Sequence, residues 1–380
     1  MRFVAYDDQV FERDGEGLWT ERTFPLFIAE VGADLGGLAL IGRLRGERAG
    51  ASFRLPPRVE FVGLPFYASL AHPRAAAGQV LASLRVFWRE LANADGAWIL
   101  GPHPFGLLFA LMTLARRRRL VLGVRQELRA YARRRHPSRR SLHLVADLLE
   151  ASWRLLARFC AVVVVGPELA TQYRRARRLH VLHVSMMRAA HVAAPEVERR
   201  RRYDGELTML SVGRLDEEKN PLLLADVLAT ARASGRSWRL VVCGVGSLEG
   251  KLARRLEDLG VAAAAELRGY VPIDAGLRDV YREAHAFLHV SWTEGVPQVL
   301  FEAFAARLPV VATDVGGVRA VAEGASLLIP PGDRDAAVAA LERLAADGEL
   351  RTRLTDAGAA VVTGHTLESE AGRVAAFLVA

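Results

Sequence analysis

Short runs of β-branched and other apolar residues alternate with longer helical stretches, and this alternation restricts the possible folds more than any other feature. In the first half, strands are predicted at 2–6, 38–42, 58–62, 97–100, 120–124, 161–165 and 179–184. Helical stretches lie between several of them, at 78–92, 105–117 and 143–158. Alternation of this kind calls for a parallel sheet with helices on its faces. We therefore predict an α/β domain with a doubly wound parallel sheet.

The alternation stops in a polar segment and then starts again. Residues 185–206 contain a proline, four consecutive arginines and an Asp-Gly pair, which are typical of a domain boundary. Beyond it, strands are predicted at 207–212, 239–243, 265–269, 286–290, 308–312 and 326–329, and helices at 221–234, 248–259, 276–284, 297–306, 317–323 and 334–346. We expect two domains, 1–190 and 191–364, followed by a helix at 365–380. Ligands of such sheets bind outside the carboxyl ends of the strands.

The composition places the protein among globular chains. With 380 residues, of which 51% are apolar and 25% charged, the chain can bury two cores and is too apolar to be disordered. The two cysteines, Cys160 and Cys243, occur in β-branched runs and are expected to be buried thiols. No run reaches the ~18 apolar residues of a membrane-spanning helix, and charges near the N-terminus argue against a secretory signal. We therefore expect a cytoplasmic protein.

Positive charge is concentrated in the first half. Residues 1–190 carry 29 Lys+Arg against 16 Asp+Glu, whereas residues 191–380 carry 22 against 27. The arginines of the first half are clustered, at 116–119, 133–135, 139–140 and 174–178. Such clusters are either solvated helix faces or surfaces that attract polyanions. No nucleic-acid-binding motif occurs, so nucleic acid is not expected, but the basic half could make a peripheral contact with the anionic inner face of a membrane.

Two cations follow a predicted strand in the second half. The segment SVGRLDEEKNP, 211–221, places Gly213 at the strand end, where glycine permits a close turn. Arg214 and Lys219 follow in a polar loop before the next helix. A guanidinium fork and an ammonium group can together hold a diphosphate. The alternative is an ordinary exposed loop.

A second segment, SWTEGVPQVLFEAFAA at 291–306, leads from the end of a strand into a helix. Glu294 lies in the turn, Gly295 gives access to the backbone, and Pro297 suits the first helical position. The free N–H groups at the start of this helix favour an anion. Glu302 lies among apolar residues and is costly to bury without partners, which ribose hydroxyls could supply. The alternative is a glutamate on a narrow polar stripe.

Together these segments resemble one enzyme family. Glu294 and Glu302 form an E-x7-E motif, and with VGRLxxEKN, VVCGVGS, RGYVP and LPVVATDVGG they resemble the C-terminal domain of the GT4 (group 1) retaining glycosyltransferases. The resemblance covers 207–333 and extends weakly over the first half, which also resembles bacterial transferases for surface polysaccharides. It implies the GT-B fold, in which two Rossmann-like domains face each other across a cleft. The final helix of that family can cross back onto the first domain.

The resemblance implies a donor site in the second domain and an acceptor site in the first. Arg214 and Lys219 match the pair that binds the donor diphosphate. Glu294 matches the glutamate that faces the donor sugar, and Glu302 the glutamate that binds the ribose. The further donor-site positions are Gly213, Gly295, Val296 and Pro297, with Tyr270 and Val271 where the base is contacted.

In the first domain the resemblance points to a histidine and an arginine after two strands. His103, in GPHPFG, is a candidate contact of the donor or acceptor sugar, and the alternative is a simple loop histidine. Arg125 could hold an anionic acceptor group. Tryptophans that fall in helical or strand patterns are expected in the core, and these are Trp88, Trp98, Trp153 and Trp238.

The implied reaction moves a sugar from a nucleotide-diphosphate sugar to a glycan, lipid-linked or small-molecule acceptor. It would proceed with retention, by a front-face mechanism without a protein nucleophile. Cations and N–H groups would stabilise the charge that builds on the leaving phosphate, and no divalent metal or other cofactor is expected. The alternatives are another GT-B enzyme, such as a sugar-nucleotide epimerase or a phosphorylase, and a non-catalytic polyanion-binding protein. Motif spacing does not determine the base, the sugar or the acceptor.

Overall fold

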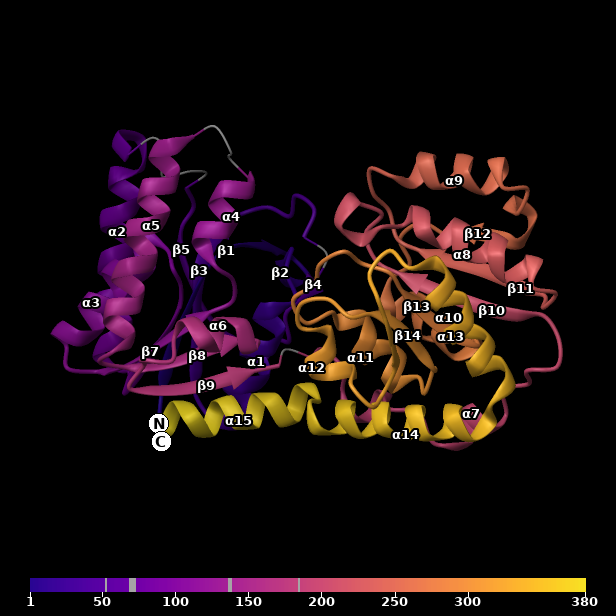
Figure 1. Cartoon of the computed structure of the whole chain (residues 1–380). Helices are drawn as coiled ribbons and strands as arrows, with labels where there is room; N and C mark the ends of the chain where they lie inside the picture. The colour runs from indigo at the N-terminus through magenta and orange to yellow at the C-terminus, as the bar shows by residue number, and fades with distance from the viewer. Residues whose placement is uncertain (52, 68–72, 136–138, 184) are drawn as a thin grey trace. The chain divides into compact units, whose positions relative to one another are not determined.

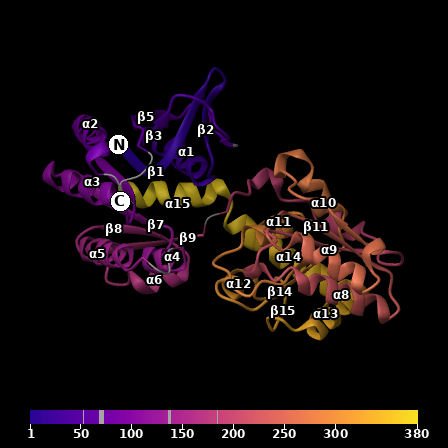
Figure 2. The ribbon, with the colours of Figure 1, turned by 90° about the horizontal axis from the view of Figure 1, so that it is seen from above.

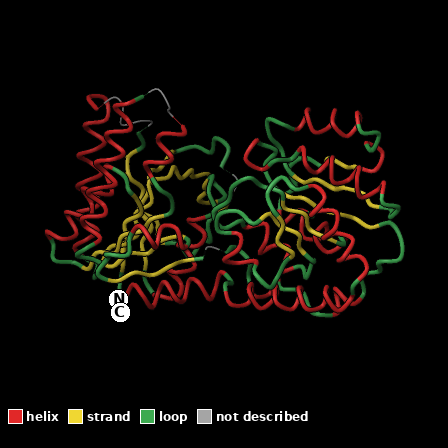
Figure 3. The backbone as a smooth tube through the Cα atoms, viewed as in Figure 1, coloured by secondary structure: helices red, strands yellow, loops and turns green. Residues whose placement is uncertain are grey.

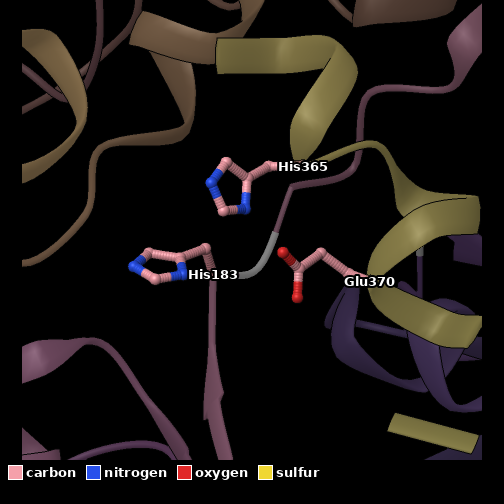
Figure 4. A group of neighbouring side chains, drawn as sticks. All are labelled: His183, His365 and Glu370. Carbon is pink, nitrogen blue, oxygen red and sulfur yellow. The ribbon is translucent and has the colours of Figure 1, made fainter. Parts of the chain in front are cut away.

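The computed structural model describes residues 1–51, 53–67, 73–135, 139–183 and 185–380, and it divides the chain into two compact units (Figure 1). Unit 1 comprises Met1–His183 and Leu367–Ala380, and unit 2 comprises Val184–Thr366. The sequence predicts the boundary between residues 190 and 191, whereas the chain passes into unit 2 after His183. It returns to unit 1 for its final helix, α15 (Leu367–Val379). Three side chains near these crossings are drawn in Figure 4: His183 and Glu370 belong to unit 1, and His365 belongs to unit 2.

Unit 1 is built on a nine-stranded sheet among the described residues (Figure 3). Parallel strands run in the order β5-β3-β1-β6-β7-β8-β9, and β2 and β4 extend it as antiparallel strands. The strands are β1 (Phe3–Asp14), β2 (Gly17–Thr20), β3 (Leu38–Arg45), β4 (Phe53–Arg54), β5 (Glu60–Pro65), β6 (Gly96–Gly101), β7 (Arg119–Val124), β8 (Ala161–Val165) and β9 (Arg178–Leu182). Every strand predicted for the first half is present, although several ends differ.

The first strand is longer than its sequence pattern indicates. Its pairing with β3 is irregular between Tyr6 and Val10, and the strand then continues to Asp14. There Asp14 Oδ1 accepts hydrogen bonds of 2.9 Å from the backbone N–H groups of Glu16 and Gly17, which closes a turn into β2. The hairpin β1–β2 was not predicted, because a charged segment with two glycines is equally typical of a loop.

Helices cover both faces of the unit 1 sheet. They are α1 (Phe24–Leu35), α2 (Pro73–Ala92), α3 (Pro104–Ala115), α4 (Leu128–Arg135), α5 (Arg140–Ala157), α6 (Pro167–Gln172) and α15. The crossover through α1 moves from β1 to β3, and those through α2, α3 and α5 move in the opposite direction along the sheet. Because parallel crossovers are right-handed, these two sets lie on opposite faces. Accordingly α3 packs beside both α2 and α5, and α15 packs on α1 (Figures 1 and 2).

Unit 2 has a six-stranded, all-parallel sheet in the order β12-β11-β10-β13-β14-β15. Its strands are β10 (Leu207–Val212), β11 (Trp238–Cys243), β12 (Ala265–Leu267), β13 (Ala286–His289), β14 (Val310–Thr313) and β15 (Leu327–Ile329). Its α-helices are α7 (Glu196–Arg199), α8 (Leu222–Ala233), α9 (Glu249–Asp258), α10 (Leu277–Glu283), α11 (Gln298–Ala305), α12 (Val318–Ala322), α13 (Arg334–Ala346) and α14 (Gly348–Gly364), with the 3-10 turn η2 at Glu217–Lys219. The predicted strands and helices all occur, within three residues at each end.

The cores confirm most of the burial predicted from sequence. Trp98, Trp153 and Trp238 are fully buried, and both cysteines are buried free thiols. The prediction for Trp88 is wrong, because this side chain lies on the outer side of α2 and is 41% exposed. Within the described parts of the chain, no helix combines the length and the hydropathy that crossing a bilayer would need.

Candidate active site

A cavity of about 240 Å³ lies at the carboxyl ends of β10 and β13 in unit 2. This is the edge at which a doubly wound sheet binds its ligands. The loop after β10, the turn η2, the loop after β13 and the start of α11 all contribute to its wall. The predicted donor-site residues that line it are Gly213, Arg214, Lys219, Glu294, Val296 and Pro297. The structure therefore brings together two segments that are about 75 residues apart in sequence.

A buried polar cluster forms one wall of this cavity. Lys219 Nζ lies 2.5 Å from Glu294 Oε1, and the Ser291 hydroxyl donates to the same oxygen at 2.8 Å. His289 Nε2 lies 3.0 Å from Glu294 Oε1 and 3.2 Å from Ser291 Oγ. The backbone carbonyl of Ser291 accepts from Thr313 Oγ1 at 2.8 Å, which ties the cluster to β14. One carboxylate oxygen is thus surrounded by three donors.

These contacts control the charge of Glu294. Its side chain is only 8% exposed, and burial alone raises the pKa of a carboxyl group. Hydrogen bonds from His289 and Lys219 outweigh that effect and bring the pKa of Glu294 down to about 2. The carboxylate is therefore ionised at neutral pH, and it holds the Lys219 ammonium group at the cavity wall. His289 Nδ1 is buried and has no hydrogen-bond partner within the described residues.

Two glycines position the loop that carries Glu294. Gly316 has φ +50°, and a Cβ atom at this position would lie 1.9 Å from the carbonyl oxygen of Glu294. A Cβ atom on Gly317 would lie 2.1 Å from the carbonyl oxygen of Gly295. Since real Cβ contacts are never that short, only glycine lets the loop after β14 approach the 294–295 backbone. The Gly-Gly pair therefore shapes the cavity, although Gly295 itself does not line it.

Arg214 lines the same cavity, but its guanidinium group is paired with acidic side chains of its own loop. Its guanidinium pairs with Asp216 and Glu218, and its side chain is 63% exposed. Asp216 is itself held by the backbone N–H and the hydroxyl of Ser247, at 3.1 and 3.0 Å. A diphosphate ligand of Arg214 would have to compete with these two carboxylates, whereas Lys219 already lies against the cavity with a single acidic partner.

Three other predicted donor-site residues do not line this cavity. Glu302 faces the opposite side of α11, where Tyr281 OH donates to its Oε2 at 2.8 Å beside a cavity of only about 20 Å³. Burial raises the pKa of the Glu302 carboxyl, and the bond from Tyr281 opposes that rise. Tyr270 is 67% exposed in the loop after β12, and Val271 packs on the core around Tyr281. The ribose and base contacts therefore stay predictions.

In unit 1, His103 belongs to a second polar network at strand ends. Its Nε2 lies 2.8 Å from Asp8 Oδ2, and Tyr67 OH donates to Asp8 Oδ1 at 2.6 Å. Arg43 Nε also approaches Asp8, at 3.2 Å. Burial opposes ionisation of Asp8, but the contacts with His103, Arg43 and Tyr67 hold its pKa well below the usual range. His103 is thus a positioned side chain rather than a free loop histidine.

Arg125 lies in the same network. Its Nη2 lies 2.9 Å from Asp7 Oδ1, and the guanidinium stacks on the Phe24 ring at 4.7 Å. Gln9 Nε2 donates to the other Asp7 oxygen at 3.0 Å. Asp7 is nearly inaccessible, and its burial raises the carboxyl pKa to about 6 in spite of Arg125. The predicted anion-binding arginine is therefore already paired with a carboxylate.

Sequence reasoning did not single out His289, Ser291, Asp7 or Asp8. All four lie where strands of a parallel sheet end or become irregular: His289 is the last residue of β13, and Asp7 and Asp8 lie in the irregular part of β1. A rule that flags polar residues at the carboxyl ends of predicted strands could have found them. His289 was read only as part of an apolar strand, AFLHV.

A chain that folds into two consecutive Rossmann-like units, each built on a parallel sheet, has the GT-B fold. The whole chain superimposes on HepE of Anabaena in complex with UDP, with a TM-score of 0.68, 15% identity and coverage of 100% of both chains. It also superimposes on WaaG, a glycosyltransferase involved in lipopolysaccharide biosynthesis, with a TM-score of 0.64, 17% identity and coverage of 99% of both chains. At these identities the likeness shows the fold alone.

The sequence of unit 2 also matches a known family. Residues 195–361 match the family of Glycosyl transferases group 1. The amylovoran biosynthesis glycosyltransferase AmsK of Erwinia amylovora is 32% identical over 146 residues, which are 36% of this chain and 36% of that protein. The chain therefore matches only about a third of the length of this curated relative.

Proposed function

We propose that the protein transfers a sugar from a nucleotide-diphosphate sugar to a glycan, lipid-linked or small-molecule acceptor. The observation that carries this proposal is the cavity of unit 2, in which Lys219, Glu294 and the start of α11 meet at the strand ends. HepE, which shares the fold, is described in complex with UDP. The relative AmsK is described as a glycosyltransferase of amylovoran biosynthesis, which supports a glycan acceptor.

In this proposal the donor diphosphate lies between Lys219 and the first turn of α11. Lys219 offers one full positive charge at the cavity wall. Val299 and its neighbours at the helix start supply backbone N–H groups that have no partner within the helix, and the helix dipole favours an anion there. Arg214 joins them once its guanidinium exchanges its carboxylate partners for phosphate oxygens. Glu302 and the Tyr270–Val271 loop are assigned to the ribose and base.

The proposed chemistry needs no protein nucleophile. The bond from the anomeric carbon to the diphosphate oxygen breaks, and its electron pair stays on the phosphate. The acceptor oxygen attacks the same face of the sugar, and its proton passes to the departing phosphate. Lys219 and the helix N–H groups stabilise the phosphate charge as it develops. Glu294, ionised and aimed at Lys219, holds that ammonium group in place. His103 contacts the acceptor or donor sugar.

Donor binding is tested by thermal unfolding with UDP-, GDP-, ADP- and dTDP-sugars. A matching ligand at 100 times its Kd adds ~2.7 kcal/mol to the free energy of unfolding, and the Lys219→Ala variant should lose most of this gain. Mass analysis of a product with a new glycosidic bond distinguishes transfer from epimerisation or phosphorolysis, and NMR of the anomeric centre reports retention. Full turnover in a chelator agrees with a metal-free reaction. If no nucleotide sugar raises the unfolding temperature, the proposal is wrong.

A further inference from the structure

The outer side of one helical layer in unit 1 is unusually apolar for a solvent-exposed surface. We define the outer face as the exposed side chains of α2, α3 and α5, the helices that cover one side of the unit 1 sheet (Figure 1). On α3 its large residues are Leu108, Leu111 and Leu114, which recur at helical spacing. The adjacent helices contribute Leu81, Trp88, Leu144, Val145, Leu148 and Leu155. Unit 2 has no comparable group among its described residues.

The α5 part of this face is a continuous stripe. Leu144 and Leu148 are 61% and 60% exposed, and Leu155 follows two turns later. Ala151 is the exposed residue between them, so that no charged side chain interrupts the stripe from Leu144 to Leu155. Trp153 and Ala157, on the opposite side of the helix, are buried in the core. Helix α5 is therefore apolar on two sides, and only one of them is used for folding.

Arginines surround the apolar stripe. Arg139 and Arg140 are exposed at the start of α5, and Arg158 is exposed at its end. Beyond Arg158 a surface hollow of about 620 Å³ adjoins Leu155 and is lined by Arg154, Arg158, Arg174 and Arg175. Among the described residues that line this hollow there is no carboxylate. Arg116, directly after α3, stacks over the ring of Trp88 on α2 at 4.0 Å. The side chains of Arg134 and Arg135 lie outside the described part of the chain.

The acidic residues of these helices do not neutralise the face. Helices α2, α3 and α5 contain three acidic residues, Glu90, Asp147 and Glu150. Glu90 pairs with Arg2, and Asp147 with Arg129 and Arg133. Glu150 is fully buried, where it accepts from Tyr173 at 2.8 Å and lies 3.4 Å from Arg154. The outer face therefore combines a strip of exposed leucines with an excess of arginine.

From this combination we infer that the outer face of α2, α3 and α5 docks onto an anionic lipid bilayer. Exposed leucines can enter the boundary between head groups and acyl chains, while arginines at that level pair with lipid phosphates. The hollow beside Leu155 would hold one such phosphate. A second copy of the chain is a poorer partner, because the same excess of arginine on both copies would repel. This inference does not rest on the proposed transferase activity.

Co-sedimentation with vesicles tests the docking surface. We expect the 380-residue chain to bind vesicles that contain phosphatidylglycerol and to bind vesicles of pure phosphatidylcholine only weakly. Salt should release the chain from the anionic vesicles. Leu144→Glu with Leu148→Glu should lower the partition coefficient at least tenfold. Arg158→Gln and Arg175→Gln should each lower it roughly fivefold, the factor that corresponds to about 1 kcal/mol per basic residue near an anionic surface. Binding of both vesicle types alike, or of neither, would overturn the inference.

Matched controls separate the surface from general charge effects. Two variants of exposed residues in unit 2 serve as controls. Ala339→Glu on α13 adds a negative charge, as the leucine variants do, and Arg254→Gln on α9 removes a positive charge, as the arginine variants do. Both should bind vesicles as the unchanged protein does, and all variants should keep the thermal shift with a nucleotide sugar. If the leucine variants bind vesicles fully but abolish a concentration-dependent dimer in sedimentation, the face is a protein interface and the inference is wrong. Absence of the nucleotide-sugar response in the unchanged protein would count against the proposed function instead.

Discussion

The two parallel sheets end in polar networks of different kinds. In unit 2 the residues at the strand ends line a cavity, and Lys219 keeps one charged partner, Glu294, at its wall. In unit 1 the corresponding edge is filled by its own ion pairs, Asp7 with Arg125 and Asp8 with Arg43 and His103. In the same architecture, the strand ends of unit 2 thus leave a cation at the wall of a cavity, where an anionic ligand can bind. The charged side chains at the strand ends of unit 1 are paired with one another. In the function proposed above, the anionic donor binds in unit 2 and the acceptor in unit 1.

The largest effect that tests this difference is expected at Lys219. Lys219→Ala should lower the turnover number by roughly 10²–10³, since it removes a preorganised cation from the developing phosphate charge. The chain has only one other lysine, Lys251, which is exposed on α9. Lys251→Ala is therefore the matched control and should leave turnover unchanged in a nucleotide-release assay. If both variants turn over normally, the cation at this cavity has no catalytic role.

The next effect concerns stability in acid and belongs to unit 2. Glu294 has a pKa of about 2 in the folded chain and an ordinary value near 4.5 when unfolded. Its contribution is thus complete above pH 4.5 and is lost as the pH falls toward 2, by about 3 kcal/mol. Urea unfolding at several pH values should show the advantage of the unchanged protein over Glu294→Gln shrinking through that range. The exposed Glu323→Gln serves as control, and a pH-independent difference would refute the assignment.

For the carboxyl group of Asp7 in unit 1, the contribution to stability should change with pH in the opposite direction. Burial raises the pKa of Asp7 from 3.8 to about 6. A group with a raised pKa contributes its full stability below pH 3.8 and loses it as the pH rises through about 6. The difference in unfolding free energy between the unchanged protein and Asp7→Asn should therefore fall by about 2 kcal/mol between pH 4 and 6. A difference that rises with pH would mean that Arg125 dominates over burial.

The smallest effect is expected at Arg214. Its guanidinium is exposed and already paired with Asp216 and Glu218, so a diphosphate gains less from it than from Lys219. Arg214→Ala should raise the KM for the donor about tenfold, with a smaller change in turnover number. Arg254→Ala, another exposed arginine of unit 2, is the control. A loss as large as that of Lys219→Ala would show that Arg214 rotates fully onto the phosphate.

Local sequence determined the elements and the motifs of this protein. Strand–helix alternation predicted both sheets, because the apolar period of a strand or helix is visible within a short window. Segments 211–221 and 291–306 identified Arg214, Lys219 and Glu294 together with the turn and helix that carry them. The family match over residues 195–361 agrees with the resemblance that these motifs indicated.

The tertiary structure decided which of these residues meet. Lys219 and Glu294 share a hydrogen bond across 75 positions, whereas Glu302, only eight residues from Glu294, faces another cavity because helical rotation turns it to the far side of α11. Asp8 gained its role only when the neighbouring strand β3 and the loop after β6 placed Arg43 and His103 beside it. His289 gained its role when the loop after its own strand folded back and brought Glu294 beside it. Likewise α3 is apolar on all sides in sequence, and only the sheet beneath it decides which leucines are buried and which are left on the surface.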